Sequence, residues 1–314
     1  INMKYIITGA TGFIGQKIIE LLVEKENEVI AIVRPNSSKT IRCSNAHVKV
    51  IALDLALIGQ LPEVLRQEHV ELHFDHFIHL GWQGTTGVER NDMDLQLNNV
   101  KTSLQCLQLA RQFHCQSFFF SGSQAEYGNI LKHGFTEQNE QNPCYPENAY
   151  GKAKLLFGEH LKQFDDNMKS YHGRIFSVYG PYDQPNSLIE TMIYKLSIGD
   201  EMILGPCAHD WNFTYIDDLA NMIVQLLCSR APSGIYNLAG TDTRPLKKFV
   251  ESIKDKREWL GHCQIGGRAY NPNSDLPLRP NVDKLRSYVD VNETSFDEGI
   301  ERTIENAQQL ILKR

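Results

Sequence analysis

Short runs of apolar residues alternate with stretches of helical periodicity along the first half of the chain. Residues 16–24 are typical of the helical stretches, since positions 18, 19, 22 and 23 are apolar and would form one stripe. Strands that alternate with helices predict an α/β fold, with a parallel sheet covered by helices. The predicted strands are Tyr5–Thr8, Val29–Val33, Val48–Ala52, His76–Leu80, Ser117–Ser121 and Arg174–Val178, and the predicted longer helices are Asp94–Phe113 and Asn148–Leu161.

The pattern becomes less regular after Gly180-Pro181. We therefore predict a dinucleotide-binding domain over residues 1–175 and a smaller, mixed substrate-binding lobe over residues 176–314. Two later strands, at Phe213–Ile216 and Ile235–Leu238, are expected to rejoin the first sheet, so that residues 213–240 belong with the first domain.

Composition narrows the class of protein. The 314 residues are 41% hydrophobic and 22% charged, with a net charge of −6, as in an ordinary soluble globular protein. An acidic chain attracts neither nucleic acid nor an anionic membrane, and no apolar run has the roughly 18 residues of a membrane span. Seven cysteines without a C-x-x-C pair are typical of reduced thiols, so we expect a cytoplasmic protein. No metal site is expected either, although His69, His73, His76 and His79 are close in sequence, because His76 and His79 fall on opposite faces of a strand.

A glycine-rich turn lies between the first strand and the first helix, with the spacing G-x-x-G-x-x-G. Glycines at these positions allow a tight turn and a close approach of the backbone to a pyrophosphate, which the helix N-terminus then binds. This context predicts a Rossmann-like, doubly wound sheet that binds a dinucleotide. The residues assigned to this contact are Gly9, Thr11, Gly12, Phe13, Ile14 and Gly15.

The end of the second strand bears on the choice of cofactor. An acidic residue there would bind the ribose hydroxyls of NAD, whereas Arg34 has the planar donors that suit the 2′-phosphate of NADP. Ser37, Ser38 and Lys39 add donors, and NADP is favoured over NAD unless Arg34 is an ordinary solvated side chain. Further along, Asp54 is expected either to meet the adenine or to cap a turn. Further predicted cofactor contacts are Leu55, Leu80, Gly81 and Trp82, of which Trp82 either covers the cofactor or packs in the core.

Tyr150 and Lys154 are four residues apart and share one face of a predicted helix. A free phenol titrates near 10, and a nearby ammonium together with a positively charged nicotinamide would lower that pKa. Such a tyrosine can donate a proton to a carbonyl or remove one from an alcohol.

With these features the chain resembles the extended short-chain dehydrogenase/reductase family of nucleotide-sugar epimerases, dehydratases and 4-ketoreductases. The resemblance implies that Tyr150 is the acid/base, that Ser123 hydrogen-bonds the reacting oxygen, and that Lys154 holds the nicotinamide ribose. It also implies that Asn99 supports the site, that Asn99, Tyr150 and Lys154 contact the cofactor, and that helices 94–113 and 148–161 form a homodimer. The motifs that carry it are Thr8–Gly15, Asn99-Val100, Phe120–Gly128, Tyr150–Lys154, Arg174–Pro181 and Tyr215–Ala220.

Departures from the family pattern reduce the number of reactions that the sequence favours. Dehydratases carry an Asp-Glu pair directly after the serine, where this chain has Gln124-Ala125 and Glu126 comes one place late. Epimerases of UDP-galactose usually have Asn at the position of Ser177 and Arg at the position of Trp211. This chain has neither, which leaves Arg279 as a remaining anchor for a substrate diphosphate. The predicted substrate-binding residues are Ser123, Gln124, Ser177, Trp211 and Arg279.

The sequence therefore predicts an oxidoreductase that uses NADP, or NAD, to reduce a 4-keto carbon of a nucleotide-linked hexose. One alternative is a C4 epimerase that retains its cofactor. A second alternative is a non-catalytic NADP-binding regulator.

Overall fold

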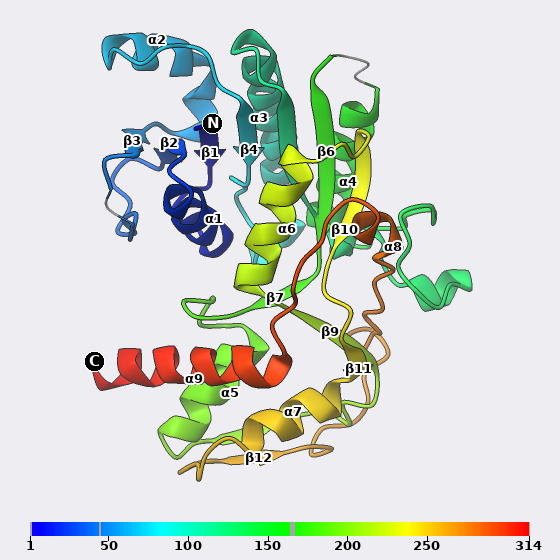
Figure 1. Ribbon diagram of the computed structural model, residues 1–314. Coiled ribbons are helices and arrows are strands. Elements are labelled where there is room, and N and C mark those ends of the chain that lie inside the picture. Colours follow the sequence, from blue (N-terminus) through cyan, green and yellow to red (C-terminus); the bar gives the residue numbers. More distant parts are fainter. Residues whose placement is uncertain (1, 44, 164–166, 314) are drawn as a thin grey trace.

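The computed structural model describes residues 2–43, 45–163 and 167–313, and its largest element is a sheet of seven parallel strands (Figure 1). The strand order β10-β6-β5-β4-β1-β2-β3 runs outward from β1 in both directions. This order confirms the predicted doubly wound, Rossmann-like fold. The strands are β1 (Lys4–Thr8), β2 (Glu28–Val33), β3 (Val48–Ala52), β4 (His76–His79), β5 (Ser117–Ser123), β6 (Lys169–Ile175) and β10 (Gly234–Leu238).

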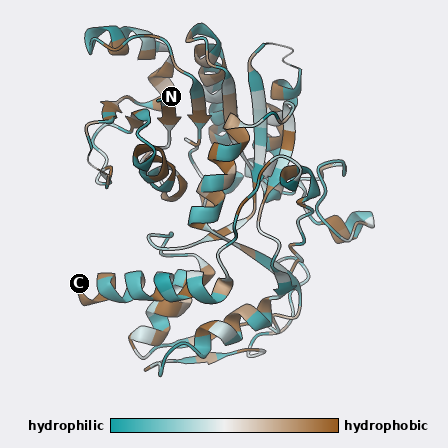
Figure 2. Ribbon diagram, viewed as in Figure 1, coloured by the Kyte–Doolittle hydropathy of each residue, from teal (hydrophilic) through white to brown (hydrophobic). Residues whose placement is uncertain are grey.

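Helices cover both faces of this sheet because its strands are apolar on both sides. Ile7 packs with α1 and α6 on one face, whereas the neighbouring Ile6 packs with α3 and α4 on the other. Hydrophobic colour accordingly concentrates on the central strands (Figure 2). The helices of this part are α1 (Phe13–Glu24), α2 (Leu61–Gln67), α3 (Met93–Gln112), α4 (Ala149–Lys162) and α6 (Ile216–Cys228), and the 3₁₀ segments are η1 (Leu55–Gln60), η2 (Val88–Asn91), η3 (Gln124–Glu126) and η4 (Ile130–His133).

A second group of elements lies below the carboxyl ends of the large sheet and is called the C-terminal lobe here (Figure 1). It has its own core, in which Phe249 and Phe296 pack edge to face with ring centres 4.7 Å apart. Its sheets contain β7 (Ser177–Tyr179), β9 (Asp210–Tyr215) and β11 (Thr243–Pro245) in one, and β8 (Glu201–Ile203) and β12 (His262–Gln264) in the other. Its helices are α5 (Leu188–Ser197), α7 (Leu246–Lys254) and α9 (Phe296–Leu312), and the short α8 (Asp283–Arg286) lies against β10.

Two predicted strands differ from the structure. The strand expected at Phe213–Ile216 does not rejoin the large sheet, because β9 pairs with β7 and β11 instead. Its apolar side chains, such as Phe213, are covered by α7 and α9 in the second core. The strand expected at Arg174–Val178 is divided, with β6 ending at Ile175 in the large sheet and β7 beginning in the small one.

The segment at Ile235–Leu238 does join the large sheet, as β10 beside β6. The division into two domains at residue 175 stays a proposal. None of the helices in the described ranges combines the length and apolar character needed to span a membrane.

Candidate active site

The glycine-rich turn joins β1 to α1 and leaves the first turn of that helix open. Gly9 has a φ of 68°, and a Cβ there would lie 2.8 Å from the amide nitrogen of Gly81. Gly12 donates its amide to the Gly9 carbonyl at 3.0 Å and is the N-cap of α1, without a side-chain acceptor. The first amides of α1, which precede that of Gln16 bonded to the Gly12 carbonyl at 3.0 Å, are therefore left for an anion. The residues present fit the pyrophosphate of a dinucleotide.

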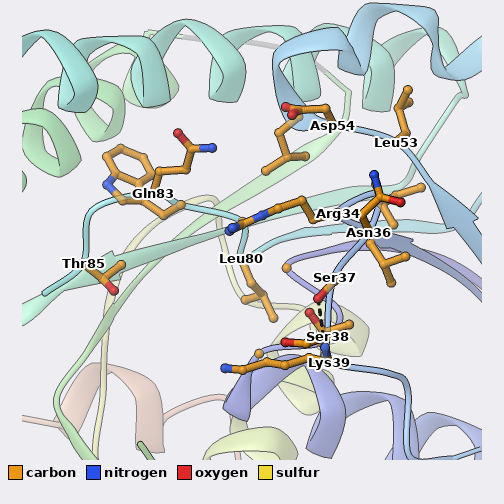
Figure 3. A pocket seen from close by; sticks show the side chains of 18 of the residues that line it. Arg34, Asn36, Ser37, Ser38, Lys39, Leu53, Asp54, Leu80, Gln83 and Thr85 are labelled. Carbon is orange, nitrogen blue, oxygen red and sulfur yellow. Dashed lines mark hydrogen bonds between the residues drawn. The ribbon is translucent and has the colours of Figure 1, made fainter. Parts of the chain in front are cut away.

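A cavity of about 550 Å³ opens beside this turn, along the carboxyl ends of β1 to β4 (Figure 3). The predicted cofactor residues that line it are Gly9, Thr11, Gly12, Arg34, Ser38, Asp54, Leu55, Leu80, Gly81 and Trp82. The predicted residues that do not line it are Phe13, Ile14 and Gly15, in the first turn of α1, and Asn99, Tyr150 and Lys154. Sequence reasoning missed Asn36, Gln83, Thr85 and Gln184, which also line the cavity and belong to irregular segments without a motif.

The cavity has a basic and hydroxyl-rich end. The exposed side chain of Arg34 lies in the opening, with Ser37, Ser38 and Lys39 on one side of it (Figure 3). Asp54 is the one carboxylate among the described lining residues. Its Oδ1 accepts the amide of Ala56 at 2.8 Å, so Asp54 caps η1 and lines the cavity at the same time.

Buried hydrogen bonds fix the end of β4 against β1. The ring of His79 bonds Thr8 Oγ1 through Nδ1 at 2.6 Å and Ser103 Oγ through Nε2 at 2.8 Å. Thr8 Oγ1 also accepts the amides of Leu80 and Gly81, at 3.2 and 3.1 Å. Burial lowers the pKa of His79 to about 3, so the ring is neutral at physiological pH. This network sets the backbone that lines the cavity.

Asn99 lies on α3 behind the cavity and holds residues 81–92, which we call the β4–α3 segment. Its side chain pairs with the backbone of Gln83, accepting the amide at 3.0 Å and donating to the carbonyl at 2.9 Å. One turn earlier, Gln96 accepts the indole N–H of Trp82 at 2.7 Å. Asn99 is therefore placed to support the site.

Ser123, Tyr150 and Lys154 meet where β5 runs into η3 and α4 begins. Ser123 is the N-cap of η3, where its hydroxyl accepts the Ala125 amide at 3.1 Å, and its side chain lies close to that of Tyr150. Gly151 allows this approach, because a Cβ there would lie 2.6 Å from the carbonyl oxygen of Ala125. The start of α4 can then pack directly on the turn that carries Ser123.

Lys154 is buried beneath Tyr150 and faces an aromatic ring. Its Nζ donates to the Ser121 carbonyl at 2.5 Å and lies 4.0 Å from the centre of the Trp82 ring and 5.5 Å from that of Tyr150. The pKa of Lys154 is lowered to about 7, chiefly by burial and in part by the Arg90 charge, while the Glu126 carboxylate opposes the fall. Lys154 is therefore only partly charged at neutral pH.

Burial raises the pKa of Tyr150 above its ordinary value, and two neighbours oppose that rise. One is the hydrogen bond with Ser123, and the other is the positive charge of Arg90. The Arg90 guanidinium carbon lies 4.1 Å from the centre of the Tyr150 ring. Sequence reasoning missed Arg90, because nothing in the spacing indicates that this residue folds back over the tyrosine.

A buried ionic cluster lies directly behind Ser123. The Glu126 carboxylate accepts the Ser123 amide at 2.9 Å, His172 Nε2 at 2.9 Å and Arg174 Nε at 2.8 Å. Burial alone would raise the pKa of Glu126, but His172 and Arg174 lower it to about 2. Glu126 is therefore an ionised structural group, and it is fully buried, away from any substrate.

Two of the predicted substrate residues, Ser177 and Trp211, line a second cavity of about 430 Å³ in the C-terminal lobe. The Trp211 Nε1 atom is buried and has no hydrogen-bond partner among the described residues. Arg268 also lines this cavity and pairs with Asp275, with Nη2 2.8 Å from Oδ1. Arg268 lies in an irregular stretch, and no sequence signal indicated it.

Arg279 and Gln124 lie elsewhere. Arg279 lines neither of these two cavities, and its Nε donates to Asp210 Oδ2 at 2.7 Å. Gln124 begins η3, directly after Ser123, and also lines neither cavity.

Comparison with known proteins identifies the group to which this arrangement belongs. The family model described as "NAD dependent epimerase/dehydratase family" matches residues 5–239. The chain belongs to this family. The match confirms the resemblance to extended short-chain dehydrogenases and reductases.

Proteins similar to this chain cover nearly its whole length. Protein CapI of Staphylococcus aureus is 25% identical over 96% of this chain and 98% of its own. The UDP-N-acetylglucosamine 4-epimerase from Methanobrevibacter ruminantium superposes with a TM-score of 0.83 at 21% identity, over 100% of this chain and 99% of its own. The UDP-glucose 4-epimerase of Thermus thermophilus, solved with NAD, gives 0.80 at 19% identity, over 98% and 99%. At these identities the solved structures establish the fold.

Proposed function

We propose that the protein is an NAD(P)-dependent oxidoreductase that reduces a 4-keto carbon of a nucleotide-linked hexose. The observation that carries the proposal is the contact of Ser123 with Tyr150, beside Lys154 and next to a cavity that fits a dinucleotide. A substrate nucleotide would occupy the second cavity, lined by Trp211 and Arg268.

A nicotinamide cofactor held in this cavity would supply the hydride for the keto carbon. Tyr150 donates its hydroxyl proton to the carbonyl oxygen as negative charge develops there. Ser123 hydrogen-bonds the same oxygen and fixes its direction. Lys154 would hold the nicotinamide ribose through Nζ, which lies beside the ring of Trp82, one of the residues that line the cavity.

The residues after Ser123 argue against dehydration. Gln124 and Ala125 occupy the positions of the acid pair, and the nearby Glu126 is buried and bonded to His172 and Arg174. No carboxylic acid is thus available there to protonate a leaving hydroxyl.

A C4 epimerase is the second candidate, and the similarity to solved 4-epimerases favours it. A relative from Aggregatibacter actinomycetemcomitans is named dTDP-6-deoxy-L-talose 4-dehydrogenase (NAD(+)) and is 27% identical over 80% of this chain and 89% of its own. Its name favours oxidation and reduction at C4. Similar solved structures contain NAD. The preference for NADP is our own proposal and rests on Arg34.

The deciding experiment mixes the protein with NADPH or NADH and a panel of UDP-, CDP-, GDP- and dTDP-4-keto-6-deoxysugars. Loss of cofactor absorbance in proportion to added sugar is the expected result. Isomerised sugar without loss of cofactor would replace the reductase with the epimerase. If no sugar causes either change, both the reductase and the epimerase are overturned, and a non-catalytic NADP-binding protein is indicated.

A further inference from the structure

The β4–α3 segment brings a second cation onto Tyr150. Residues 81–92 leave the large sheet after β4 and return over the first turn of α4, where the guanidinium of Arg90 faces the tyrosine ring at 4.1 Å. Arg90 is half-buried, and its Nη1 donates to the Thr85 carbonyl at 2.7 Å. Thr85 itself lines the cofactor cavity (Figure 3).

The return of this segment is built into the structure. Gly84 and Gly87 have φ values of 66° and 65°, a backbone conformation that favours glycine. Gln96, fully buried on α3, donates through Nε2 to the carbonyls of Gly84 at 2.8 Å and Glu89 at 3.1 Å. These contacts lie on both sides of the loop that precedes Arg90, so they hold the guanidinium over the ring.

Arg90 is the permanently charged group that faces Tyr150. A guanidinium stays protonated at every pH at which a protein is folded, whereas the Lys154 pKa is lowered to about 7 by burial. The other groups that face Tyr150 are Ser123, which is neutral, and Glu126, whose negative charge disfavours the phenolate.

We propose that Arg90 is a positioning residue for the proton transfer, holding the Tyr150 ring and stabilising its phenolate through the ring face. The inference rests on the proposed role of Tyr150 as acid/base. A cation within about 4–6 Å of an acid lowers its pKa by about one unit or more. A phenolate is a stronger partner than a phenol for a cation over the ring, because its π system carries more negative charge.

The test measures the ionisation of Tyr150 directly. Tyrosine labelled with carbon-13 at Cζ is followed by NMR against pH with NADP⁺ bound, in the range where the protein stays folded, and the Tyr150 signal is assigned by its loss in Tyr150→Phe. Arg90→Gln removes the charge, Arg90→Lys keeps a charge, and Arg66→Gln is a matched control on an exposed arginine paired with Glu63.

The midpoint of the Tyr150 titration is expected to lie about one pH unit higher in Arg90→Gln than in wild type. Arg90→Lys should show less than half of that shift, and Arg66→Gln should show none. Alcohol oxidation, which needs the phenolate, should then fall about tenfold at a fixed pH below the midpoint in Arg90→Gln. An unmoved midpoint in Arg90→Gln, or an equal shift in Arg66→Gln, would overturn the role of Arg90. Absence of turnover with every sugar of the panel would overturn the proposed function instead, since the NMR titration needs no substrate.

Discussion

The side chain of Glu126 accepts the backbone amide of Ser123 at 2.9 Å and thereby ties the proposed catalytic serine to a buried ionic cluster. Because His172 and Arg174 bond the same carboxylate, the position of Ser123 depends on three side chains, one from the η3 turn and two from strand β6. Stability and activity are therefore coupled at this point of the fold.

Glu126→Gln should lower the free energy of unfolding by about 3–5 kcal/mol, since it leaves Arg174 buried without a negative partner. Urea unfolding followed by circular dichroism measures the change. Glu63→Gln, which removes an exposed carboxylate paired with Arg66, should stay within about 0.5 kcal/mol. Equal stability of wild type and Glu126→Gln would show that the cluster does not stabilise the fold.

The ionisation of the Glu126 carboxylate determines how the free energy of unfolding should change at low pH. The pKa of Glu126 falls from an ordinary 4.5 to about 2 on folding, because the opposing charges of His172 and Arg174 outweigh its burial. Its contribution is therefore complete above pH 4.5 and is lost as the pH falls from there toward 2. Unfolding free energies measured across this range should fall less steeply in Glu126→Gln than in wild type. Parallel curves would contradict the assignment.

The helices and strands of the large sheet were predictable from the sequence, because their patterns depend on residues close together in the chain. The strand at Val48–Ala52 and the helix at 94–113 follow from the pattern of apolar residues, which depends only on neighbours in the sequence. The strand at Phe213–Ile216 was placed in the wrong sheet because its apolar pattern suits either core.

The candidate site, too, was predictable only where it depends on residues close together in the sequence. The positions of Tyr150 and Lys154 follow from a helix spacing, whereas the contact of Arg90 with Tyr150 depends on the path of an irregular segment held by Gln96. Arg268 reaches the second cavity from a stretch with no periodicity. Such contacts between distant segments have no signature in a single sequence.

Tyr150→Phe should reduce turnover by about 100-fold or more, because it removes the only hydroxyl proposed to transfer the proton. Binding of NADPH, measured by fluorescence titration, should change little, since Tyr150 does not line the dinucleotide cavity. A variant that keeps most of its turnover would exclude Tyr150 as the acid/base.

The proposed homodimer places α3 and α4 at the interface, and two apolar residues there are exposed in the single chain. Leu97 on α3 is 43% exposed and Leu156 on α4 is 41% exposed. Leu97→Arg with Leu156→Arg should convert the dimer to a monomer in sedimentation velocity, because charge is costly in a buried interface. Leu131→Arg, at a 48% exposed residue of η4, is the control and should leave the dimer intact. A monomeric wild type would refute the proposed assembly.

Arg34→Ala separates the two cofactors. The side chain lies in the opening of the cavity at the end of β2, where a 2′-phosphate would add a charged hydrogen bond (Figure 3). The variant should weaken NADPH binding by about 1.5–3 kcal/mol, or roughly 10- to 150-fold in Kd, and leave NADH binding within about threefold. Calorimetric titration with both cofactors measures the two changes, and Lys132→Ala, at an exposed ion pair on η4, is the control. An equal loss of affinity for NADH and NADPH would mean that Arg34 contacts a part shared by both, and unchanged affinity for both would mean that it is a solvated side chain.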